Sequence, residues 1–391
     1  MKIGIVLPNQ PAYSETFFNT KIKGLESHGY KVILFVNSKS SSCNYNTIKV
    51  APNLSKGKLV NLGTSCKYLL QSVFFSFSAT KKLYILNRKD KLSTINNIKN
   101  IIINGHILLE KVDWLHFGFG TMALARENVA QAIGAQMAVS FRGFDHYVFP
   151  IKNRNCYKKL FEKNVKYHVL SDEMKNDLLK LGIDTNKIFK ITPAININFF
   201  QFEQKEKNEK SNCFQILTIS RLHWIKGLNS ILEALQIVKS KGINFHFTII
   251  GDGNEKERLQ FETYQLGLTE NVTFVGKLNP IEIKNQLQNS DLYLQYSHQE
   301  GFCNSVIEAQ AMRKICIVSN ADGLVENVIN NITGFVVPKR KPVHLANKIL
   351  EVLMLSETEK NKITHQAIQR VNQHFTTETQ IKQFIEFYEK I

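Results

Sequence analysis

At 391 residues, 43% of them hydrophobic and 21% charged, the chain is long enough for two ordinary globular domains and too apolar for a disordered protein. Its six cysteines occur singly, without a Cys-x-x-Cys pair, which argues against a zinc site or a disulfide framework. The first ten residues hold one lysine and an apolar run that stops at Pro8. We therefore expect a buried first strand, not a signal peptide, and a cytoplasmic protein.

The positive charge is concentrated in the first half. Residues 1–200 carry 28 Lys and Arg against 12 Asp and Glu, whereas residues 201–391 carry 22 against 21. This split suggests an anionic partner that meets one domain only: a membrane surface, a phosphorylated lipid or a nucleic acid. A solvated lysine surface explains the charge equally well.

The first half alternates short apolar stretches with amphipathic ones. We predict strands at residues 3–7, 31–36, 114–117, 137–141 and 167–170, and helices at 16–28, 121–133 and 172–181. This alternation predicts a parallel sheet with helices on both faces.

One segment of this half is rich in aromatic and apolar side chains. It runs from Lys67 to Phe77 and is followed by Lys81 and Lys82. It is too short to span a bilayer, which needs about 20 apolar residues. Two interpretations stay open: a helix that lies in the interface of an anionic membrane, or a core helix of the first domain.

The alternation restarts after a polar stretch at residues 201–212, which marks the expected domain boundary. We predict strands at 214–219, 245–250, 272–274, 292–296 and 315–319, and helices at 227–240, 255–266, 280–289 and 305–312. The domains are thus 1–200 and 213–372, followed by a C-terminal segment, 373–391, whose amphipathic helix returns to the first domain. Two doubly wound sheets leave a cleft between the carboxyl ends of their strands, where such folds bind ligands.

A basic loop follows the first strand of the second domain. Arg221 and Lys226 flank the start of the next helix, so two cations and free backbone N–H groups face an anion such as a diphosphate leaving group. The chain has no Asp-x-Asp pair to hold a divalent cation, so we expect neither a metal nor another cofactor. Two unrelated surface cations are the alternative interpretation.

A second loop, after the strand at 292–296, carries two carboxylates. Gly301 permits a tight turn into a helix, and Glu300 and Glu308 are placed to accept hydrogen bonds from sugar hydroxyls. A solvated turn followed by an ordinary charged residue on a helix gives the same spacing. The two loops together are therefore stronger evidence for a ligand site than either loop alone.

In this order and spacing, the chain resembles the retaining glycosyltransferases of family four, of the bacterial surface-polysaccharide type. The resemblance covers nearly the whole chain and is strongest over residues 214–338. The matching pieces are Ser220-Arg221-Leu222 with Lys226-Gly227, Ile249-Ile250-Gly251-Asp252-Gly253, Val272-Thr273-Phe274-Val275-Gly276, Glu300-Gly301-Phe302 with Glu308-Ala309, Glu326-Asn327, and Gly334-Phe335-Val336-Val337-Pro338. It implies an α/β protein with the GT-B fold, in which two Rossmann-like doubly wound domains face each other across a cleft.

The resemblance also implies roles for the donor side. Arg221 and Lys226 would bind the diphosphate, Glu300 the transferred sugar and Glu308 the ribose hydroxyls, with the first three forming the catalytic set. Residues 251–278 would contact the base, and the backbone from Phe302 to Ser305 would approach the sugar and phosphates. The remaining donor-binding residues are Gly253, Lys277, Gly301, Phe302, Cys303, Asn304 and Ser305.

The acceptor side is matched less closely. Ser14 and Glu15 lie where the family has its first loop, although they read equally well as a helix cap. Arg142 and Asp145 occupy the place where many members have His-Gly-x-Asp, so an arginine replaces the histidine that contacts the transferred sugar. Arg142 would supply a permanent positive charge there, with His116 and His146 as weaker substitutes.

The resemblance implies transfer of a hexose-type sugar from a UDP- or GDP-linked donor, with retention and without a metal. The acceptor would be a lipid-linked glycan in surface polysaccharide biosynthesis, met at the inner face of the membrane. A GT-B-like nucleotide-sugar epimerase, a phosphorylase and a non-catalytic nucleotide-binding module remain as alternatives. The loop Pro8-Asn9-Gln10-Pro11 lacks the Gly-x-Gly-x-x-Gly of a dinucleotide oxidoreductase, and no recognisable nucleic-acid reading element is present, so we expect no nucleic-acid partner.

Overall fold

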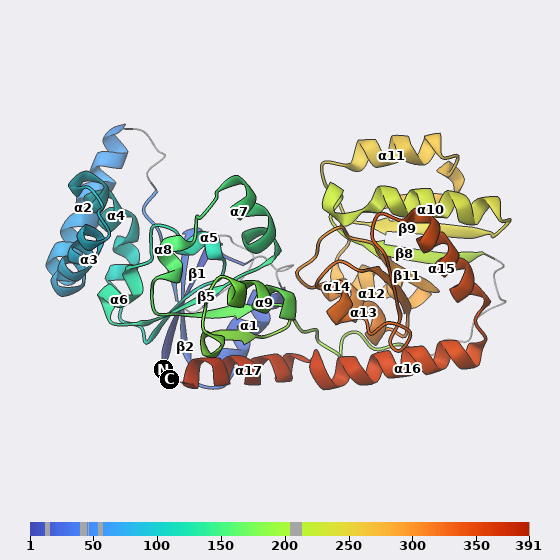
Figure 1. The fold of residues 1–391 in the computed structure, drawn as a ribbon. Coiled ribbons are helices and arrows are strands. Elements are labelled where there is room, and N and C mark those ends of the chain that lie inside the picture. Colours follow the sequence, from blue (N-terminus) through green and yellow to red (C-terminus); the bar gives the residue numbers. More distant parts are fainter. Residues whose placement is uncertain (12–15, 40–44, 46, 54–57, 204–212, 391) are drawn as a thin grey trace. The chain divides into compact units, whose positions relative to one another are not determined.

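The computed structural model describes residues 1–11, 16–39, 45, 47–53, 58–203 and 213–390 (Figure 1). Internal contacts divide the chain into two compact units: unit 1 holds residues 1–191 and 381–391, and unit 2 holds residues 192–380. The sequence placed the boundary at 201–212. The chain leaves unit 1 earlier because its last strand, which the apolar pattern did not predict, ends at Lys190.

Unit 1 contains a sheet of seven parallel strands in the order β3-β2-β1-β4-β5-β6-β7. The strands are β1 (Lys2–Asn9), β2 (Lys31–Ser38), β3 (Ile48–Val50), β4 (Trp114–Phe117), β5 (Gln136–Ser140), β6 (Val165–Val169) and β7 (Ile188–Lys190). The five strands predicted from the sequence are all present. The short β3 and β7 add one strand at each edge.

The helices of unit 1 fall between these strands. They are α1 (Thr16–Ser27), α2 (Lys58–Phe75), α3 (Phe77–Lys89), α4 (Thr94–Leu108), α5 (Gly120–Ala123), α6 (Val129–Ile133), the π-helix η1 (Phe144–Val148), α7 (Phe149–Lys152), α8 (Lys158–Phe161), α9 (Asp172–Lys180) and the 3-10 helix η2 (Thr185–Lys187). The single helix predicted over 121–133 is wrong. Leu124 is extended and Ala125 adopts a positive φ of 60°, which separates α5 from α6.

The last helix, α17 (Thr377–Glu389), completes the core of unit 1. Its side chains Phe384, Phe387 and Tyr388 are fully buried in a cluster with the strands β1 and β2 and helix α1. Trp114 Nε1 donates a hydrogen bond of 3.1 Å to the carbonyl of Tyr388. Burying each large apolar side chain contributes about 1.5–3 kcal/mol, which explains why the C-terminal end of the chain belongs to unit 1.

Unit 2 contains a sheet of six parallel strands in the order β10-β9-β8-β11-β12-β13. They are β8 (Phe214–Ile219), β9 (Phe245–Ile250), β10 (Val272–Gly276), β11 (Leu292–Gln295), β12 (Ile315–Ser319) and β13 (Phe335–Val337). The first five confirm the predicted strands. The sixth strand, β13, lies in a segment that matched the family resemblance but was not predicted to form a helix or a strand.

The helices of unit 2 cover this sheet. They are the 3-10 helix η3 (Trp224–Lys226), α10 (Leu228–Ser240), α11 (Lys256–Gln265), the 3-10 helix η4 (Thr269–Asn271), α12 (Pro280–Asn289), α13 (Asn304–Ala311), α14 (Leu324–Asn327), α15 (Pro342–Met354) and α16 (Glu357–His374). Two of them begin with complete capping boxes, at Asn279 and Ser356.

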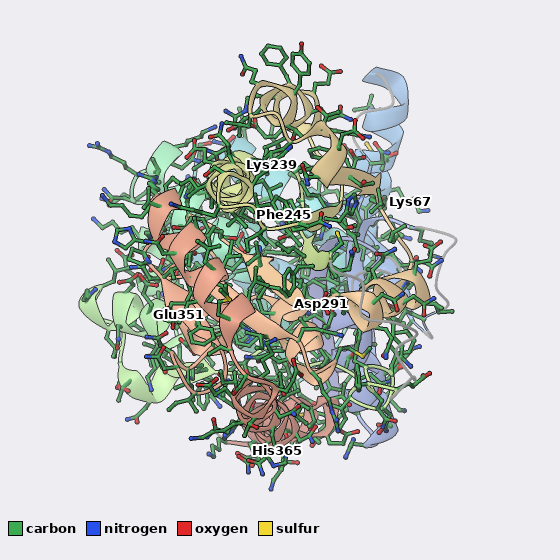
Figure 2. All side chains as sticks on the ribbon, turned by 90° about the vertical axis from the view of Figure 1, so that its right-hand side faces the viewer. Lys67, Lys239, Phe245, Asp291, Glu351 and His365 are labelled. Atoms are coloured by element: carbon green, nitrogen blue, oxygen red, sulfur yellow. The ribbon has the colours of Figure 1, made fainter. Side chains whose placement is uncertain are left out.

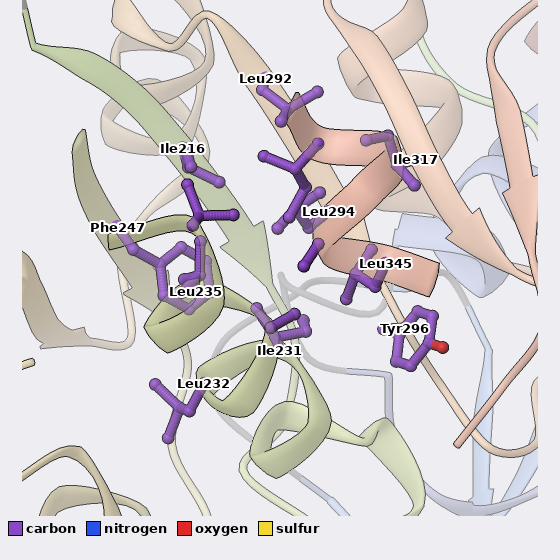
Figure 3. Packing of buried hydrophobic residues seen from close by; sticks show 14 of the residues in the cluster. Ile216, Ile231, Leu232, Leu235, Phe247, Leu292, Leu294, Tyr296, Ile317 and Leu345 are labelled. Atoms are coloured by element: carbon purple, nitrogen blue, oxygen red, sulfur yellow. The ribbon is translucent and has the colours of Figure 1, made fainter. Parts of the chain in front are cut away.

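The core of unit 2 lies between the sheet and its helices. Ile231 and Leu235 of α10 meet Leu345 of α15 and the strand residues Leu294 and Ile317, all fully buried (Figure 3). Figure 2 shows Phe245 of β9 inside this unit, whereas Lys239 at the end of α10 and His365 on α16 lie at its outside. Of the helices that the structure describes, none is both long enough and apolar enough to cross a membrane.

Candidate functional site

The strand order of unit 2 reverses between β8 and β11. From β8 the chain builds outward through β9 and β10, and then returns to place β11 on the other side of β8. In an open parallel sheet the loops at such a point separate at the carboxyl ends of the strands and leave room for a ligand. The two loops singled out from the sequence, 220–227 and 297–304, follow these two strands.

The loop after β8 is anchored by an apolar side chain and by two close backbone approaches. Leu222 is fully buried, while Arg221 beside it is exposed. A Cβ on Gly227, which has a φ of +61°, would lie 2.3 Å from the carbonyl oxygen of Tyr296, and a Cβ on Gly253 would lie 2.2 Å from that of Leu222. Only glycine fits at either position, so the loop is held against both neighbouring strands.

The side chains of Lys226 and Glu300 form an ion pair across the two loops. Both side chains are largely buried. Burial alone would lower the pKa of Lys226, but the negative charge of Glu300 outweighs it and the pKa is raised; the neighbouring charge of Arg221 opposes this effect. Lys226 therefore stays cationic throughout the neutral range.

A chain of hydrogen bonds from β11 orients Glu300. The amide of Gln295 donates to Ser297 Oγ at 3.1 Å, and Ser297 Oγ donates to Glu300 Oε2 at 3.1 Å. Gln295 and Ser297 are both buried, and Ser319 Oγ donates to the carbonyl of Ser297. The carboxylate of Glu300 is thus fixed by two donors, Ser297 and Lys226. The sequence did not identify Gln295 as a contributor, because its side chain acts through Ser297.

The backbone in front of α13 is clamped by a buried amide. Asn327 is fully buried; its Oδ1 accepts from the N–H of Cys303 at 3.0 Å, and its Nδ2 donates to the carbonyl of Cys303 at 3.1 Å. Cys303 immediately precedes α13, and Ser305 in the first turn lies 2.8 Å from the hydroxyl of Tyr293. Asn327 therefore fixes the approach to the N-terminus of α13. The sequence placed Asn327 in a matching piece without giving it a role.

The remaining donor-side residues lie on elements of the same unit. Gly301, Phe302, Asn304 and Ser305 belong to the turn and first turn of α13, and Phe302 packs edge-on against Phe375 with ring centroids 5.4 Å apart. Lys277, exposed, follows β10.

Glu308 lies on α13 with a raised pKa. Burial raises the pKa of its carboxyl to about 7. Among the described residues the carboxylate has no hydrogen-bond or ion-pair partner, so its acceptor capacity is available to a ligand. A carboxyl that titrates near neutrality and lacks a protein partner is a common feature of ligand sites.

The acceptor-side residues of unit 1 show a different arrangement. His116 is fully buried in β4: its Nδ1 lies 2.6 Å from the hydroxyl of Tyr388 and 3.1 Å from Lys21 Nζ, and its Nε2 lies 2.8 Å from Ser140 Oγ. Burial, then the charge of Lys21, lowers the pKa of His116 well below its usual value. His116 is therefore a neutral, fully hydrogen-bonded core residue and is not exposed to a ligand.

His116, Ser140, His168 and Tyr388 form one hydrogen-bonded cluster, and a single backbone carbonyl determines which atoms in it carry the protons. His168 Nε2 lies 2.9 Å from the carbonyl of Ile191 and must donate to it, so His168 Nδ1 accepts from Ser140 at 2.7 Å. Ser140 then accepts from Nε2 of His116, which leaves Nδ1 of His116 as the acceptor for Tyr388. The chain of donors joins three strands of the sheet to α17.

Of the other acceptor-side residues that the structure describes, Arg142 and Asp145 interact with each other. The guanidinium of Arg142 lies over the rings of Phe17 and Phe18, at 4.0 and 4.5 Å. Asp145 is buried in the π-helix η1 and accepts from Thr121 at 3.0 Å; burial raises its pKa. Ser14 and Glu15 lie outside the described residues. The structure thus brings His116 and Arg142 close to Lys21, and a backbone hydrogen bond from Arg142 joins Asp145 to Arg142.

Several known proteins are similar in sequence to this chain. Residues 199–370 match the family described as glycosyl transferases group 1. The chain is 23% identical to the putative colanic acid biosynthesis glycosyltransferase WcaL of Escherichia coli, over 96% of both chains, and 25% identical to the amylovoran biosynthesis glycosyltransferase AmsK of Erwinia amylovora, over 100% of both. A third relative is the N,N'-diacetylbacillosaminyl-diphospho-undecaprenol alpha-1,3-N-acetylgalactosaminyltransferase of Campylobacter jejuni, 27% identical over 57% of this chain and 59% of that one.

Solved structures share the fold over the whole chain. A glycosyltransferase of Rickettsia africae aligns with a TM-score of 0.72 at 22% identity, covering 100% of this chain and 98% of that one. The Anabaena protein HepE, solved in complex with UDP-glucose, aligns with a TM-score of 0.74 at 16% identity over 100% of both chains. These findings confirm the family resemblance and the fold expected from the sequence. Residues 199–370 form a domain of the glycosyl transferases group 1 family, and the chain is a glycosyltransferase with the GT-B fold.

Proposed function

We propose that this glycosyltransferase moves a hexose-type sugar from a UDP- or GDP-linked donor to a lipid-linked glycan, with retention of anomeric configuration and without a metal ion. The observation that carries the proposal is the pairing of Lys226 with Glu300 at the strand reversal of unit 2, next to the exposed Arg221. One cation is held in place by a carboxylate, and the second is free to turn toward a ligand.

The two cations and the start of α13 match a diphosphate. Arg221 and Lys226 would neutralise the charge that develops on the leaving group, and the backbone after Cys303, fixed by Asn327, would donate N–H groups to it. Glu308 would accept hydrogen bonds from the ribose hydroxyls, and Glu300 from the transferred sugar. Gly253 and Lys277 would lie toward the base.

The proposed reaction exchanges one bond for another at the anomeric carbon. The bond from this carbon to the diphosphate oxygen breaks, and the electron pair stays with the diphosphate. An acceptor hydroxyl attacks from the same face, so configuration is retained, and its proton passes to the departing diphosphate. In this scheme the chain supplies positive charge and orientation, and no side chain forms a covalent intermediate.

The names of the relatives support the acceptor class. One acts on a sugar linked to diphospho-undecaprenol, and two belong to colanic acid and amylovoran biosynthesis. We infer that this chain likewise extends a lipid-linked glycan in the making of a surface polysaccharide, on the cytoplasmic side of the membrane.

The test is a screen of UDP- and GDP-sugars with the purified full chain, in EDTA, with and without a diphospho-undecaprenol-linked sugar. We expect the release of nucleoside diphosphate to rise at least tenfold when the lipid-linked acceptor is added. NMR of the product should show the same anomeric configuration, axial or equatorial, as that of the donor sugar. Donor binding without transfer to any acceptor would support a binding module. A product of inverted configuration would exclude same-face attack. If activity is lost in EDTA and Mg²⁺ or Mn²⁺ restores it fully, the metal-free scheme is overturned.

A further inference from the structure

A pair of helices in unit 1 is joined by a bend at Ser76. Helices α2 and α3 follow β3 and precede α4, with which they form a small helical group (Figure 1). Ser76 leaves helical geometry, with φ −143° and ψ 40°. The carbonyl of Ser72 accepts from the N–H of Ser76 at 3.2 Å and from Thr80 Oγ1 at 2.8 Å, so the bend has a defined structure.

The inner side of this pair is packed. Ser72, Thr80 and Leu83 are buried, and a Cβ on Gly105 of α4 would lie 3.0 Å from the ring of Tyr68. The hydroxyl of Tyr68 also lies 3.3 Å from the carbonyl of Val50. Close packing on this side fixes which face of α2 and α3 is turned outward.

The outer side presents large apolar side chains. Phe74 and Phe75 are 75% and 79% exposed, Phe77 is 61% exposed, and Leu70 and Val73 are also exposed. We call these five residues the bend patch. Their exposure argues against the core-helix interpretation of this segment, because a core helix would bury them. An apolar patch of this kind on a folded protein marks an interaction surface.

The charge around the bend patch has one sign. Residues 27–89 contain ten Lys and Arg and no Asp or Glu. Lys67 on α2, and Lys81 and Lys82 on α3, are exposed on the helices that carry the patch. The next acidic residue in the chain, Asp90, is held at the far end of α3 by Lys163 at 2.8 Å and by Asn128 at 2.7 Å.

We propose that the bend patch docks the protein onto an anionic phospholipid bilayer, with the three phenylalanines in the interfacial layer and the lysines on the headgroups. Exposed apolar side chains on two helices whose charged residues are all Lys or Arg fit a surface that is apolar below and negative above. A second copy of the chain fits poorly, since a symmetric contact would bring the same lysines together. The docking goes beyond the proposed glycosyl transfer and needs neither donor nor acceptor.

The test is flotation of the full chain with vesicles of phosphatidylcholine alone and of phosphatidylcholine with 30% phosphatidylglycerol. We expect binding to the anionic vesicles only, with a loss of at least fivefold between low and high salt. Phe74→Ser with Phe75→Ser, and separately Lys81→Glu with Lys82→Glu, should each reduce binding at least fivefold. The matched controls Phe261→Ser with Tyr264→Ser and Lys241→Glu with Lys362→Glu, at exposed positions of unit 2, should bind like the unchanged chain.

A fluorescent probe separates insertion from adsorption. The chain already contains Trp114 and Trp224, so the emission of each variant is compared with that of the unchanged chain. The emission added by Phe75→Trp should shift to shorter wavelength and be quenched by lipids brominated on their acyl chains, whereas that added by Phe261→Trp should not. Any of three results would overturn the proposal. The first is an equal loss of binding in test and control variants, and the second is no binding to anionic vesicles. The third is self-association in solution that Phe74→Ser with Phe75→Ser abolishes. Since no step measures transfer, failure here would leave the proposed reaction standing, and loss of transfer would leave the docking standing.

Discussion

Both units place polar side chains at a strand reversal, between β1 and β4 in unit 1 and between β8 and β11 in unit 2, but the cluster around His116 in unit 1 is complete, whereas the site of unit 2 is not. In unit 1 the donors and acceptors of His116, Ser140 and His168 are all used, and Tyr388 of α17 closes the set. In unit 2 the carboxylate of Glu308 lacks a partner among the described residues, and Arg221 is exposed. A saturated polar cluster holds a fold together, whereas an unsaturated one can bind a ligand.

The largest expected effect on transfer comes from the ion pair of unit 2. Lys226→Ala should lower kcat with the nucleotide sugar by about 10²–10³-fold, because it removes a fixed cation from the leaving group, a loss on the order of 3–4 kcal/mol. Steady-state kinetics of purified protein would measure this, with circular dichroism to verify folding. Lys241→Ala, at an exposed position of the same unit, is the control, and turnover of Lys226→Ala within threefold of the control would remove Lys226 from the reaction.

The raised pKa of Glu308 predicts a dependence on pH. Since burial raises this pKa to about 7, the carboxyl is protonated below pH 7 and loses acceptor capacity, so donor affinity should fall by up to about tenfold per pH unit below 7. The same shift means that ionisation opposes folding. Glu308→Gln should therefore be more stable than the unchanged chain at pH 8 and about equal at pH 5.

Calorimetric titration of the donor from pH 5.5 to 8.5, with thermal unfolding at both ends, would check the role of Glu308. Glu308→Gln should bind weakly and without the pH dependence. A slope that survives in Glu308→Gln would assign the titration to another group.

A smaller effect is expected from the amide that clamps Cys303. Asn327→Ala leaves the N–H and carbonyl of Cys303 without partners, so the donor KM should rise by about tenfold, corresponding to a loss of about 1–3 kcal/mol. Asn327→Asp keeps the hydrogen-bond acceptor and loses the donor, so its donor KM should lie between that of the unchanged chain and that of Asn327→Ala. Asn271→Ala also removes a side-chain amide bonded to a backbone carbonyl, that of Phe245, and serves as the control. If both alanine variants change only thermal stability, Asn327 is structural.

The smallest effect on transfer is expected in unit 1. His116→Gln breaks the buried donor chain and should lower the free energy of unfolding by about 2 kcal/mol, while kcat of the folded protein stays within twofold. Denaturant unfolding and kinetics on the same sample measure both. A large loss of kcat without loss of stability would reverse the contrast between the units and return His116 to the acceptor side.

The sequence predicted what depends on local pattern. Strands such as β8, β9 and β12 are continuous apolar runs between turn residues, and their limits matched the prediction residue for residue. The prediction of one helix over 121–133 failed because the extended Leu124 ends α5 and the positive φ of Ala125 follows it, and the residue types at these positions do not announce either conformation. Short edge strands such as β3 and β7 have too few residues for a periodic signal.

Contacts between distant residues were not predictable. Asn327 reaches back 24 residues to Cys303, and Tyr388 lies 272 residues from His116. A histidine within an apolar strand gives the same sequence pattern whether it faces a ligand or a core, and here the packing of α17 shows that His116 belongs to the core. The pair of Lys226 and Glu300 was predicted as two separate ligand-binding residues, and their direct contact emerged only from the fold.

The strand reversal of unit 2 is the proposed binding site of the donor diphosphate. Calorimetric titration of UDP and GDP into the full chain, Arg221→Ala, Lys226→Ala and His116→Gln at pH 8 tests this site. We expect one nucleotide to bind the unchanged chain and His116→Gln with equal affinity, and each cation variant to bind at least tenfold more weakly. Equal affinity in all four proteins, or a loss confined to His116→Gln, would rule this site out.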